Sequence, residues 1–579
     1  MIAVHSGFPW VMVTALVPLA GVVAILALPK AREQQAKFVA LGASLVAMVV
    51  SIVMAFAYKT NGARFQFVQD YTWIKAFGAH YALGVDGIAL ALILMTTVLT
   101  PVCVLASWHD ADPVDGPDGP APSGRGPRLF FALLLATETL VVGVFGALDV
   151  FFFYVLFEAM LIPMYFLIGS FGGPRRSYAA VKFLLYSLAG GLLMLVAVIA
   201  LYVVSSHQLG TGTFDYQVLV SRLHISHGEQ VALFLGFFIA FAIKAPLWPF
   251  HTWLPDAASE APTGTAVMLV GVLDKVGTFG FLRFCIPLFP YASKLLAPYV
   301  LGLCVTGILY GALAAIGQRD MKRLVAYSSV SHFGFIALGV FAFTTQGGSG
   351  ATLYMVNHGF STGALFIVVG FLASRRGSRL VDDFGGVAKV APWLGAMVMV
   401  AGLSALALPG MSTFVSEFLV LVGTFTAHRW FAVVGIFGIV LAAVYVLWMI
   451  QRTIHGPVTA AVEGFKDLSL REAWVIAPVM VVIVALGVYP KPILDFINPS
   501  VQQTNSVVRT HDPYPSVPER SATNAACSTS LARPVPKNIG TAAYQSRLTI
   551  TLCDTYSGIV NVNTGLGKPV SHFGAGSGK

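Results

Sequence analysis

Long apolar stretches recur along most of this chain, and they constrain its fold more than any other feature. A helix of about 20 apolar residues spans the ~30 Å of hydrocarbon in a bilayer. Short polar loops separate the stretches, which predicts an all-α, polytopic membrane protein of about 14 transmembrane helices. The predicted spans are 8–28, 36–57, 81–107, 129–146, 148–170, 180–204, 230–253, 261–283, 295–316, 324–344, 352–373, 392–426, 430–450 and 473–490.

The composition excludes two other classes of protein. Hydrophobic residues make up 57% of the chain and charged residues 11%, against about 45–50% and about 25% in soluble domains. A soluble enzyme of this size and composition would have too few polar side chains to cover its surface. A membrane β-barrel would show alternating ten-residue segments instead. The net charge of +9 comes from basic residues in short loops, which form no continuous face. No nucleic-acid partner is expected.

The distribution of Lys and Arg predicts the orientation in the membrane. Alternate loops carry 18 basic residues on one side, Lys322 among them, and 8 on the other, including Arg64 and Arg283. Because the basic side faces the cytoplasm, both termini are predicted to lie on the other side of the membrane, outside the cytoplasm. No basic residue precedes Lys30, so the first span lacks the positive region of a signal peptide.

Two predicted spans contain helix-breaking residues near their middle. One reads IKAPLWPFHTWLP over 243–255, and the other reads SALALPGMSTF over 404–414. Proline removes a backbone donor, and the freed carbonyls need protein or water partners inside a membrane. Paired interrupted helices in two halves are typical of transporters with a central pathway. The spacing predicts two repeats of five spans, each with the broken helix fourth, and the odd number makes the second repeat inverted.

These features divide the chain into five regions. The repeats occupy 129–283 and 295–450 and are flanked by an N-terminal three-helix region with an acidic, Pro/Gly-rich loop (1–128), a transmembrane helix (451–498) and a polar tail (499–579). The loop over 110–127 and the tail are expected to be weakly ordered and carry no motif that indicates a function.

The sequence carries no recognisable cofactor site. Cys103, Cys285 and Cys304 lie in or beside spans and Cys527 and Cys553 lie in the tail, with no CxxC pair among them. A GxGxxG motif after a strand is also missing, and the Gly-rich run at 574–579 has the wrong spacing for a phosphate-binding loop. No nucleotide, flavin, iron–sulfur or metal site is expected in this chain.

Ionisable residues deep in the apolar spans carry the functional signal. Such a group costs roughly 2.5–3.5 kcal/mol at the centre of a membrane helix, so it must pair, titrate or contact water. The candidates are Asp86, Glu138, Glu158, Lys244, Lys275, His332, His358 and Glu417.

A structural role is the alternative for each candidate. Asp86 and Glu138 could be hydrogen-bonding groups, and Lys275 could pair with the adjacent Asp274, although neighbours on a helix point to different faces. The histidines could be neutral core side chains or, less simply, haem ligands. Function is favoured for Lys244 and Glu417, which lie beside the two helix breaks. Glu158 is the best charge partner for Lys244.

Together these groups have the chemistry of a proton pathway. Buried carboxylates, amines and imidazoles can pass protons along water chains when burial and neighbouring charges bring their proton affinities together. A Glu–Lys pair acts as a switch, because separating the pair lowers the proton affinity of the lysine. The opposing hypothesis is a purely structural membrane scaffold.

At these residues the chain resembles the antiporter-like subunits of respiratory complex I and of multisubunit cation/proton antiporters. The strings that carry the resemblance are FEAMLIPMYFLIG, KAPLWPFHTWLPDAASEAPT, QRDMKRLVAYSSVSHFGF and NHGFSTGALF, within about 80–490. An acidic residue in the second broken helix, here Glu417, is typical of the M-type (complex I subunit 4) members, whose sister subunits usually carry lysine. No long amphipathic helix or further span follows 490, which argues against an L-type member.

The resemblance implies roles for the candidates. Glu158 and Lys244 would form the switch pair, Lys275 the central relay, His332 and His358 its continuation, and Glu417 the terminal site. Glu138 would help couple neighbouring subunits. NADH oxidation and quinone reduction, with flavin and iron–sulfur clusters, would take place in other subunits. Expected partners are other membrane subunits of complex I, above all the two sister antiporter-like subunits. The alternative is a subunit of a cation/proton antiporter or membrane-bound hydrogenase.

Overall fold

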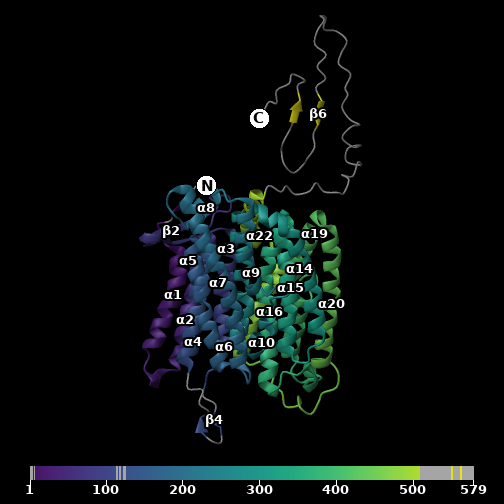
Figure 1. The fold of residues 1–579 in the computed structure, drawn as a ribbon. Coiled ribbons are helices and arrows are strands. Elements are labelled where there is room, and N and C mark those ends of the chain that lie inside the picture. Colours follow the sequence, from purple (N-terminus) through teal and green to yellow (C-terminus); the bar gives the residue numbers. More distant parts are fainter. Residues whose placement is uncertain are drawn as a thin grey trace, which may run out of the picture. The chain divides into compact units, whose positions relative to one another are not determined.

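The structure, a computed structural model, describes residues 4–5, 7–112, 115–116, 119–120, 126–508, 549–551 and 561–563. The chain divides into two compact units, 1–513 and 514–579. In the second unit, β6 (Thr549–Thr551) pairs with β7 (Asn561–Asn563) in antiparallel fashion. The first unit is a bundle of helices and holds all the candidate residues (Figure 1).

Within the described residues, 13 helices are long and apolar enough to cross a membrane. Eleven are single α-helices: α1 (Trp10–Ala27), α2 (Gln35–Ala57), α3 (Gly87–Ala106), α4 (Pro127–Gly146), α7 (Arg176–Leu209), α9 (His227–Lys244), α14 (Pro290–Ile316), α15 (Met321–Phe341), α16 (Thr345–Arg376), α20 (Arg429–Thr453) and α21 (Leu470–Val488). The other two consist of consecutive segments. One joins α5 (Val150–Ala159) to α6 (Leu161–Phe171), and the other runs through α11 (Thr263–Val267), η3 (Met268–Leu273), α12 (Lys275–Gly280), η4 (Phe281–Cys285) and α13 (Ile286–Leu288).

The predicted span 392–426 is the fourteenth. It consists of two shorter apolar helices, α18 (Pro392–Ala405) and α19 (Ser412–Ala427). The other broken helix is formed by α9 and α10 (Trp253–Glu260). The all-α, multi-span fold is therefore confirmed. Short helices connect the spans: η1 (Lys30–Arg32), η2 (Lys75–Phe77), α8 (Tyr216–Arg222), η5 (Val381–Asp383) and α17 (Val387–Val390).

A small sheet lies beside the helices. β2 (Gln66–Ile74) and β3 (Ala79–Val85) form an antiparallel hairpin with Tyr71 opposite Tyr81, and β1 (Val4–His5) pairs with β2 in parallel. The predicted span 81–107 therefore begins too early, because residues 81–85 are a strand. Asp86 ends the strand and starts α3, since its carboxylate accepts the N–H of Ala89 at 2.9 Å. Hydropathy alone cannot separate an apolar strand from the helix that follows it.

The predicted boundary at 499 is also wrong. α22 (Lys491–Val507) continues past it, and Ile497 and Val501 are completely buried. A side chain at Gly87 would lie 1.7 Å from the carbonyl of Phe496, so α22 packs closely on the start of α3. Most of the remaining tail, from 509 on, lies outside the described residues. So does part of the 110–127 loop, where β4 (Asp115–Gly116) pairs with β5 (Gly119–Pro120).

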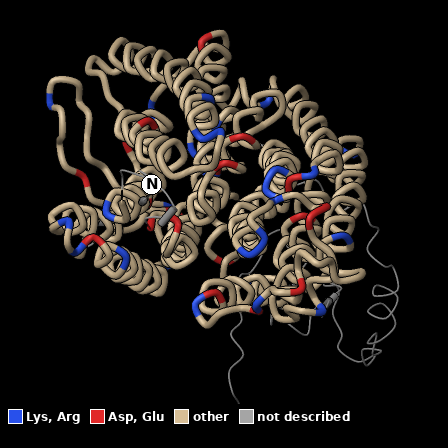
Figure 2. Tube along the Cα trace, turned by 90° about the horizontal axis from the view of Figure 1, so that it is seen from below, with Lys and Arg blue, Asp and Glu red and all other residues tan. Residues whose placement is uncertain are grey.

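Burial differs sharply between helices and locates the centre of the bundle. The apolar windows of α16 and of the span Thr263–Leu288 are entirely buried, whereas only 28% of the α2 window is. Exposed apolar side chains such as Phe38 and Val46 on α2 form a surface suited to lipid. In Figure 2, Lys and Arg (blue) lie close to Asp and Glu (red) on neighbouring segments, and most of the trace (tan) carries no charged residue. The interior helices carry most of the ionisable candidates.

Candidate functional site

The first broken helix is stabilised by side-chain and backbone donors at its break. Pro246 cannot donate to the carbonyl of Ala242, and the N–H of Leu247 donates to it instead at 2.9 Å. The indole Nε1 of Trp253 donates to the carbonyl of Ile243 at 2.9 Å. The break thus keeps its backbone bonded and places Lys244 at the end of α9.

The second broken helix is bonded in a similar way. The N–H groups of Ala407 and Leu408 donate to the carbonyls of Ser404 and Leu403 at 3.0 and 3.1 Å, and the Thr413 hydroxyl also donates to Ser404. Gly410 has a φ of +93°, a conformation that favours glycine. Glu417 lies on the helix that restarts after this break, as the sequence predicts.

Lys244 and Glu158 lie near each other without direct contact. Lys244 is 1% exposed, and its ammonium lies 5.1 Å from the ring centroid of Phe157 and 5.5 Å from that of Phe183. The Glu158 carboxylate packs against Gly191 of α7, where a Cβ atom would lie 1.6 Å from Oε1. The charges of the two residues act on each other, yet the Lys244 ammonium and Oε1 of Glu158 have no hydrogen-bond partner among the described residues. Lys244 and Glu158, the expected charge pair, are therefore neighbours whose charged groups are separated by a gap.

Lys275 is bonded directly to its neighbours. Its Nζ donates to the carbonyl of Val270 at 2.5 Å and lies 2.7 Å from Nδ1 of His358 on α16. The ammonium also lies 5.1 Å from the ring centroid of Phe333. No ion pair within 4.0 Å joins Lys275 to the adjacent Asp274, although their charges act on each other. Lys275 faces the second half of the molecule.

A row of buried polar side chains continues from Lys275 to Glu417. The ring of His332 lies 5.3 Å from that of His358 and 5.8 Å from that of Tyr354, measured between centroids. The Tyr354 hydroxyl donates to Oε1 of Glu417. Sequence reasoning missed Tyr354, since a tyrosine in an apolar span has no distinguishing pattern. The structure thus brings Lys275, His358, His332 and Glu417 together.

Glu138 on α4 stands apart from this row. Its side chain is completely buried, beside Thr100 of α3. Neither carboxylate oxygen forms a hydrogen bond or ion pair within the described part of the chain.

Asp86 has a structural role in addition to capping α3. Its carboxylate lies 2.9 Å from Nη2 of Arg283 and 3.9 Å from Nε of Arg64. Both arginines are buried, at 2% and 6% exposure, although the sequence analysis counted them as loop residues. They were misplaced because hydropathy does not detect an arginine neutralised by a distant acid. The cluster ties α3 to η4.

Asp149 caps the helix that carries Glu158. It lies just before the span of α5 and accepts the N–H of Phe152 at 2.8 Å and that of His80 in β3 at 3.0 Å. Burial raises the pKa of Asp149 to about 6, against these hydrogen bonds, which oppose the rise. The hairpin and α5 are therefore joined through one carboxyl group.

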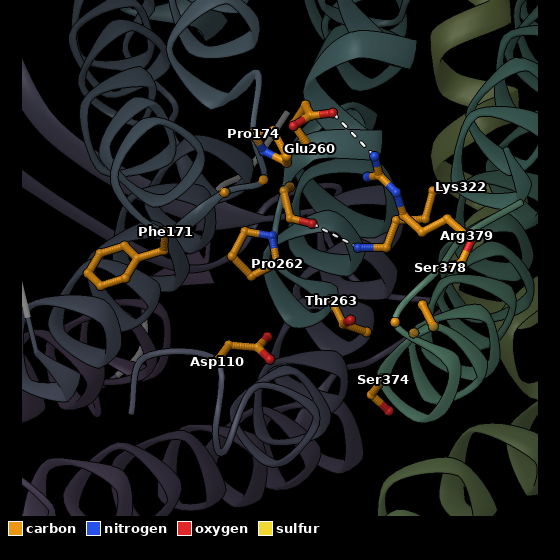
Figure 3. A pocket seen from close by; sticks show the side chains of 16 residues that line it. Asp110, Phe171, Pro174, Glu260, Pro262, Thr263, Lys322, Ser374, Ser378 and Arg379 are labelled. Carbon is orange, nitrogen blue, oxygen red and sulfur yellow. Dashed lines mark hydrogen bonds and ion pairs between the residues drawn. The ribbon is translucent and has the colours of Figure 1, made fainter. Parts of the chain in front are cut away.

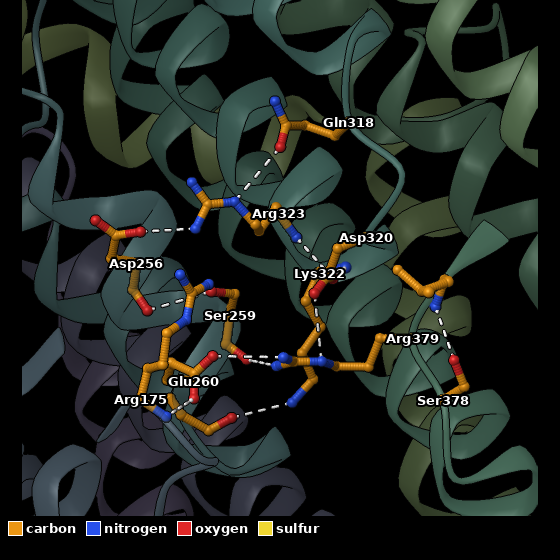
Figure 4. A network of polar contacts seen from close by, with 12 residues as sticks. Arg175, Asp256, Ser259, Glu260, Gln318, Asp320, Lys322, Arg323, Ser378 and Arg379 are labelled. Atoms are coloured by element: carbon orange, nitrogen blue, oxygen red, sulfur yellow. Dashed lines mark hydrogen bonds and ion pairs between the residues drawn. The ribbon is translucent and has the colours of Figure 1, made fainter. Parts of the chain in front are cut away.

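A charged network at one end of the bundle was also missed (Figure 4). Arg379 bridges Glu260 at 3.4 Å and Asp320 at 3.3 Å, while Arg323 contacts Asp256 at 2.6 Å. Lys322, expected in a loop, is 7% exposed and donates to the carbonyl of Ala261 at 3.0 Å.

Beside this network lies a cavity of about 530 Å³ (Figure 3). Asp110, Glu260, Lys322, Arg379 and Thr263 are among its lining residues. A cavity lined by charged and hydroxyl side chains can hold water.

Buried hydroxyl groups lie between this cavity and Lys275. The helices η3 and α11 run beside α16, since side chains added at Gly370, Gly363 and Gly359 would meet Thr263, Val267 and Gly271. Thr265, Ser361 and Thr362 lie within this stretch, and none of their hydroxyls has a hydrogen-bond partner in the described residues. Buried hydroxyls without protein partners are sites for ordered water.

Fold and site together define a class: a polytopic membrane protein with a buried row of acids and bases between two interrupted helices. The family model described as NADH:quinone oxidoreductase/Mrp antiporter, TM matches residues 147–442. NADH-quinone oxidoreductase subunit M of Mycobacterium tuberculosis is 52% identical over 535 residues, covering 88% of this chain and 97% of that protein. The chain belongs to this family of membrane subunits.

Two other comparisons agree. NADH-quinone oxidoreductase subunit M of Rhodobacter capsulatus is 40% identical over 484 residues, covering 81% of this chain and 90% of that protein. The solved structure of respiratory complex I from Thermus thermophilus with bound NADH contains a chain with a TM-score of 0.77 and 30% identity. That match covers 86% of this chain and 99% of the other.

Proposed function

We propose that this chain is the proton-translocating subunit M of a bacterial NADH:quinone oxidoreductase. The buried row from Lys275 through His358, His332 and Tyr354 to Glu417 is the observation that carries the proposal. Protons are its substrate, and redox chemistry with flavin, iron–sulfur clusters and quinone takes place in other subunits. Its partners are other membrane subunits of the complex, including the two sister antiporter-like subunits.

The two halves of the site contribute different steps. A protonated Lys244 is held by the nearby charge of Glu158, and a movement that separates them lowers the proton affinity of the lysine. The released proton reaches Lys275, which passes it to His358 across 2.7 Å. His332 and Tyr354 lead to the Glu417 carboxylate, the terminal site.

The cavity is the proposed site of proton uptake from the cytoplasm. It lies at the end of the bundle where α10 ends and α15 begins, among loops that the basic-residue count assigns to the cytoplasmic side. The unpartnered hydroxyls of Thr265, Ser361 and Thr362 give water a route from it toward Lys275. Both termini then lie on the periplasmic side, and the repeats 129–283 and 295–450 are inverted relative to each other.

Two substitutions test the proposal in inner-membrane vesicles. Lys244→Ala and Glu417→Ala are each expected to lower NADH-driven proton pumping by about tenfold or more, since a positioned acid or base contributes about 10²–10⁴ in rate. Lys389→Ala, at an exposed lysine, is the matched control. NADH:ferricyanide activity in the same membranes monitors assembly.

Retained pumping in both variants would contradict the proposal and favour a structural scaffold. Purification of the chain with its partners separates the remaining alternatives. Flavin- and iron–sulfur-containing partners with NADH dehydrogenase activity support the oxidoreductase, whereas a cation/proton antiporter or a hydrogenase would bring different subunits.

A further inference from the structure

Asp274 is a buried carboxylate that none of the roles above uses. It lies at the junction of η3 and α12 and is 0% exposed. Neither of its oxygens forms a hydrogen bond within the described residues. The adjacent Lys275 forms no ion pair within 4.0 Å with it, because that ammonium is bonded to Val270 and His358.

Asp274 lies between two contacts that its helix makes with its neighbours. Residues three and four apart are neighbours on a helix surface, so Asp274 lies beside both Gly277 and Thr278. Gly277 packs on the end of α9, where an added Cβ would lie 2.5 Å from the carbonyl of Phe241. Thr278 contacts Met355 of α16 at 2.7 Å. Asp274 therefore lies on the side of α12 between α9, which ends in Lys244, and α16, whereas Lys275 contacts His358 of α16 directly.

The charges around Asp274 agree with this placement. The two charges that act on Asp274 are those of Lys275 and Lys244, and Lys244 in turn is acted on by Glu158 and Asp274. A buried carboxylate without a hydrogen-bond donor is strongly destabilised if it is ionised and dry. Asp274 must therefore bind a proton or contact water during turnover.

The backbone before Asp274 suits such a position. η3 is a π-helical segment of six residues, and π-helical turns occur frequently at functional sites. Its wider turn leaves the Val270 carbonyl to accept from Lys275, five residues later in the chain.

We propose that Asp274 is a proton-carrying residue that links Lys244 to Lys275 and so joins the two halves of the row. The proposal rests on the proposed function. In the first step, a proton leaves Nζ of Lys244 and binds the Asp274 carboxylate through water, which leaves a neutral amine and a neutral carboxylic acid. In the second step, the acid gives the proton to the neutral amine of Lys275, and the carboxylate is restored.

The test measures NADH-driven proton pumping by the assembled complex in inner-membrane vesicles. Asp274→Asn keeps the shape of the side chain but cannot carry a proton, and it is expected to lower pumping about tenfold. Asp274→Leu fits an apolar, buried site and is expected to show the same loss, so the result does not depend on one variant. Asp274→Glu restores a carboxyl group and is expected to keep at least about half of the rate.

Two controls and a spectroscopic readout complete the experiment. Asp382→Asn changes an exposed acid, and Lys275→Ala tests the proposed function itself. NADH:ferricyanide activity monitors assembly. A carboxylic-acid band in the redox-induced infrared difference spectrum is expected in the wild type and lost in Asp274→Asn, which a merely structural role would not produce.

The outcomes separate the two proposals. If Asp274→Asn and Asp274→Leu pump like the wild type while Lys275→Ala does not, the role of Asp274 is overturned and the proposed function stands. If Lys275→Ala also pumps normally, the proposed function fails. A loss in both Asp274 variants that Asp274→Glu reverses supports the link.

Discussion

The two halves of the buried row are built differently. In the second half, polar atoms are in direct contact: Lys275 with His358 and Tyr354 with Glu417. In the first half, Lys244 lies against two aromatic rings and has no hydrogen bond to any residue that the structure describes, and Glu158 is near but not in contact. A pair held apart can change its separation at little structural cost, whereas the bonded contacts of Lys275 and Tyr354 are fixed. The first half is therefore suited to switching and the second to conduction.

Among the tests of this comparison, the largest effect is expected from disturbing the gap in the first half. Gly191→Ala places a Cβ atom 1.6 Å from Oε1 of Glu158, which must move. Because the charge of Glu158 holds the proton on Lys244, we expect NADH-driven proton pumping to fall about fivefold to tenfold, measured in vesicles. Gly302→Ala is the matched control, since nothing lies within 4 Å of a Cβ there. Normal pumping by Gly191→Ala would show that the position of Glu158 does not matter.

A moderate effect is expected from the second half. Tyr354→Phe removes the hydroxyl that donates to Glu417 but keeps the aromatic ring. A hydrogen bond to a charged group contributes about 1.5–3 kcal/mol, of which water can replace a part, so we expect pumping to fall about threefold. The measurement is the initial rate of vesicle acidification. A loss as large as that of Glu417→Ala would instead identify the Tyr354 hydroxyl as an obligatory part of the row.

The smallest effect concerns the cap of the helix that carries Glu158. The folded pKa of Asp149 is about 6 against 3.8 for the unconstrained group, so between these pH values the folded state binds the proton more tightly. The stabilisation from this proton is complete below about pH 4 and is lost as pH rises through about 6. Asp149→Asn keeps a capping oxygen but does not titrate.

Purified complex is expected to show this difference in its apparent Tm. Relative to the wild type, Asp149→Asn should gain about 1–2 °C more at pH 7 than at pH 5. An equal shift at both pH values would show that Asp149 does not titrate in this window. A gain confined to pH 5 would contradict the sign. Either result would mean that the Asp149 cap of α5 does not affect how the first half of the row responds to pH.

The sequence predicted the spans well because a helix in lipid must satisfy its backbone within itself and cover itself with apolar side chains. The predicted boundaries are wrong where an apolar segment is not part of a transmembrane helix. Residues 81–85 of β3 were included in a span, and the end of α22, 499–507, was assigned to the tail because only one face of this helix is apolar. Proline and glycine marked both helix breaks correctly, since their effect on the backbone is local.

The candidate site was predictable only residue by residue. Placing a lysine or glutamate in an apolar span costs free energy whichever way the side chain is oriented. Lys244, Lys275 and Glu417 could therefore be found from the sequence alone. Buried Arg283, Lys322 and Tyr354 were not found, because their partners Asp86, Ala261 and Glu417 lie 60 to 200 residues away in the chain.

By itself, the sequence determined that this chain crosses a membrane many times and carries costly charges inside it, since solvation depends on residue type and local pattern. Tertiary structure alone decided which charges touch and which stay apart. The packing of α12 between α9 and α16 gives Lys275 a direct contact with His358 and leaves Asp274 without a hydrogen bond among the described residues, although the two are consecutive in the chain. The physical reason is that electrostatic coupling depends on distance in space, which only the fold sets.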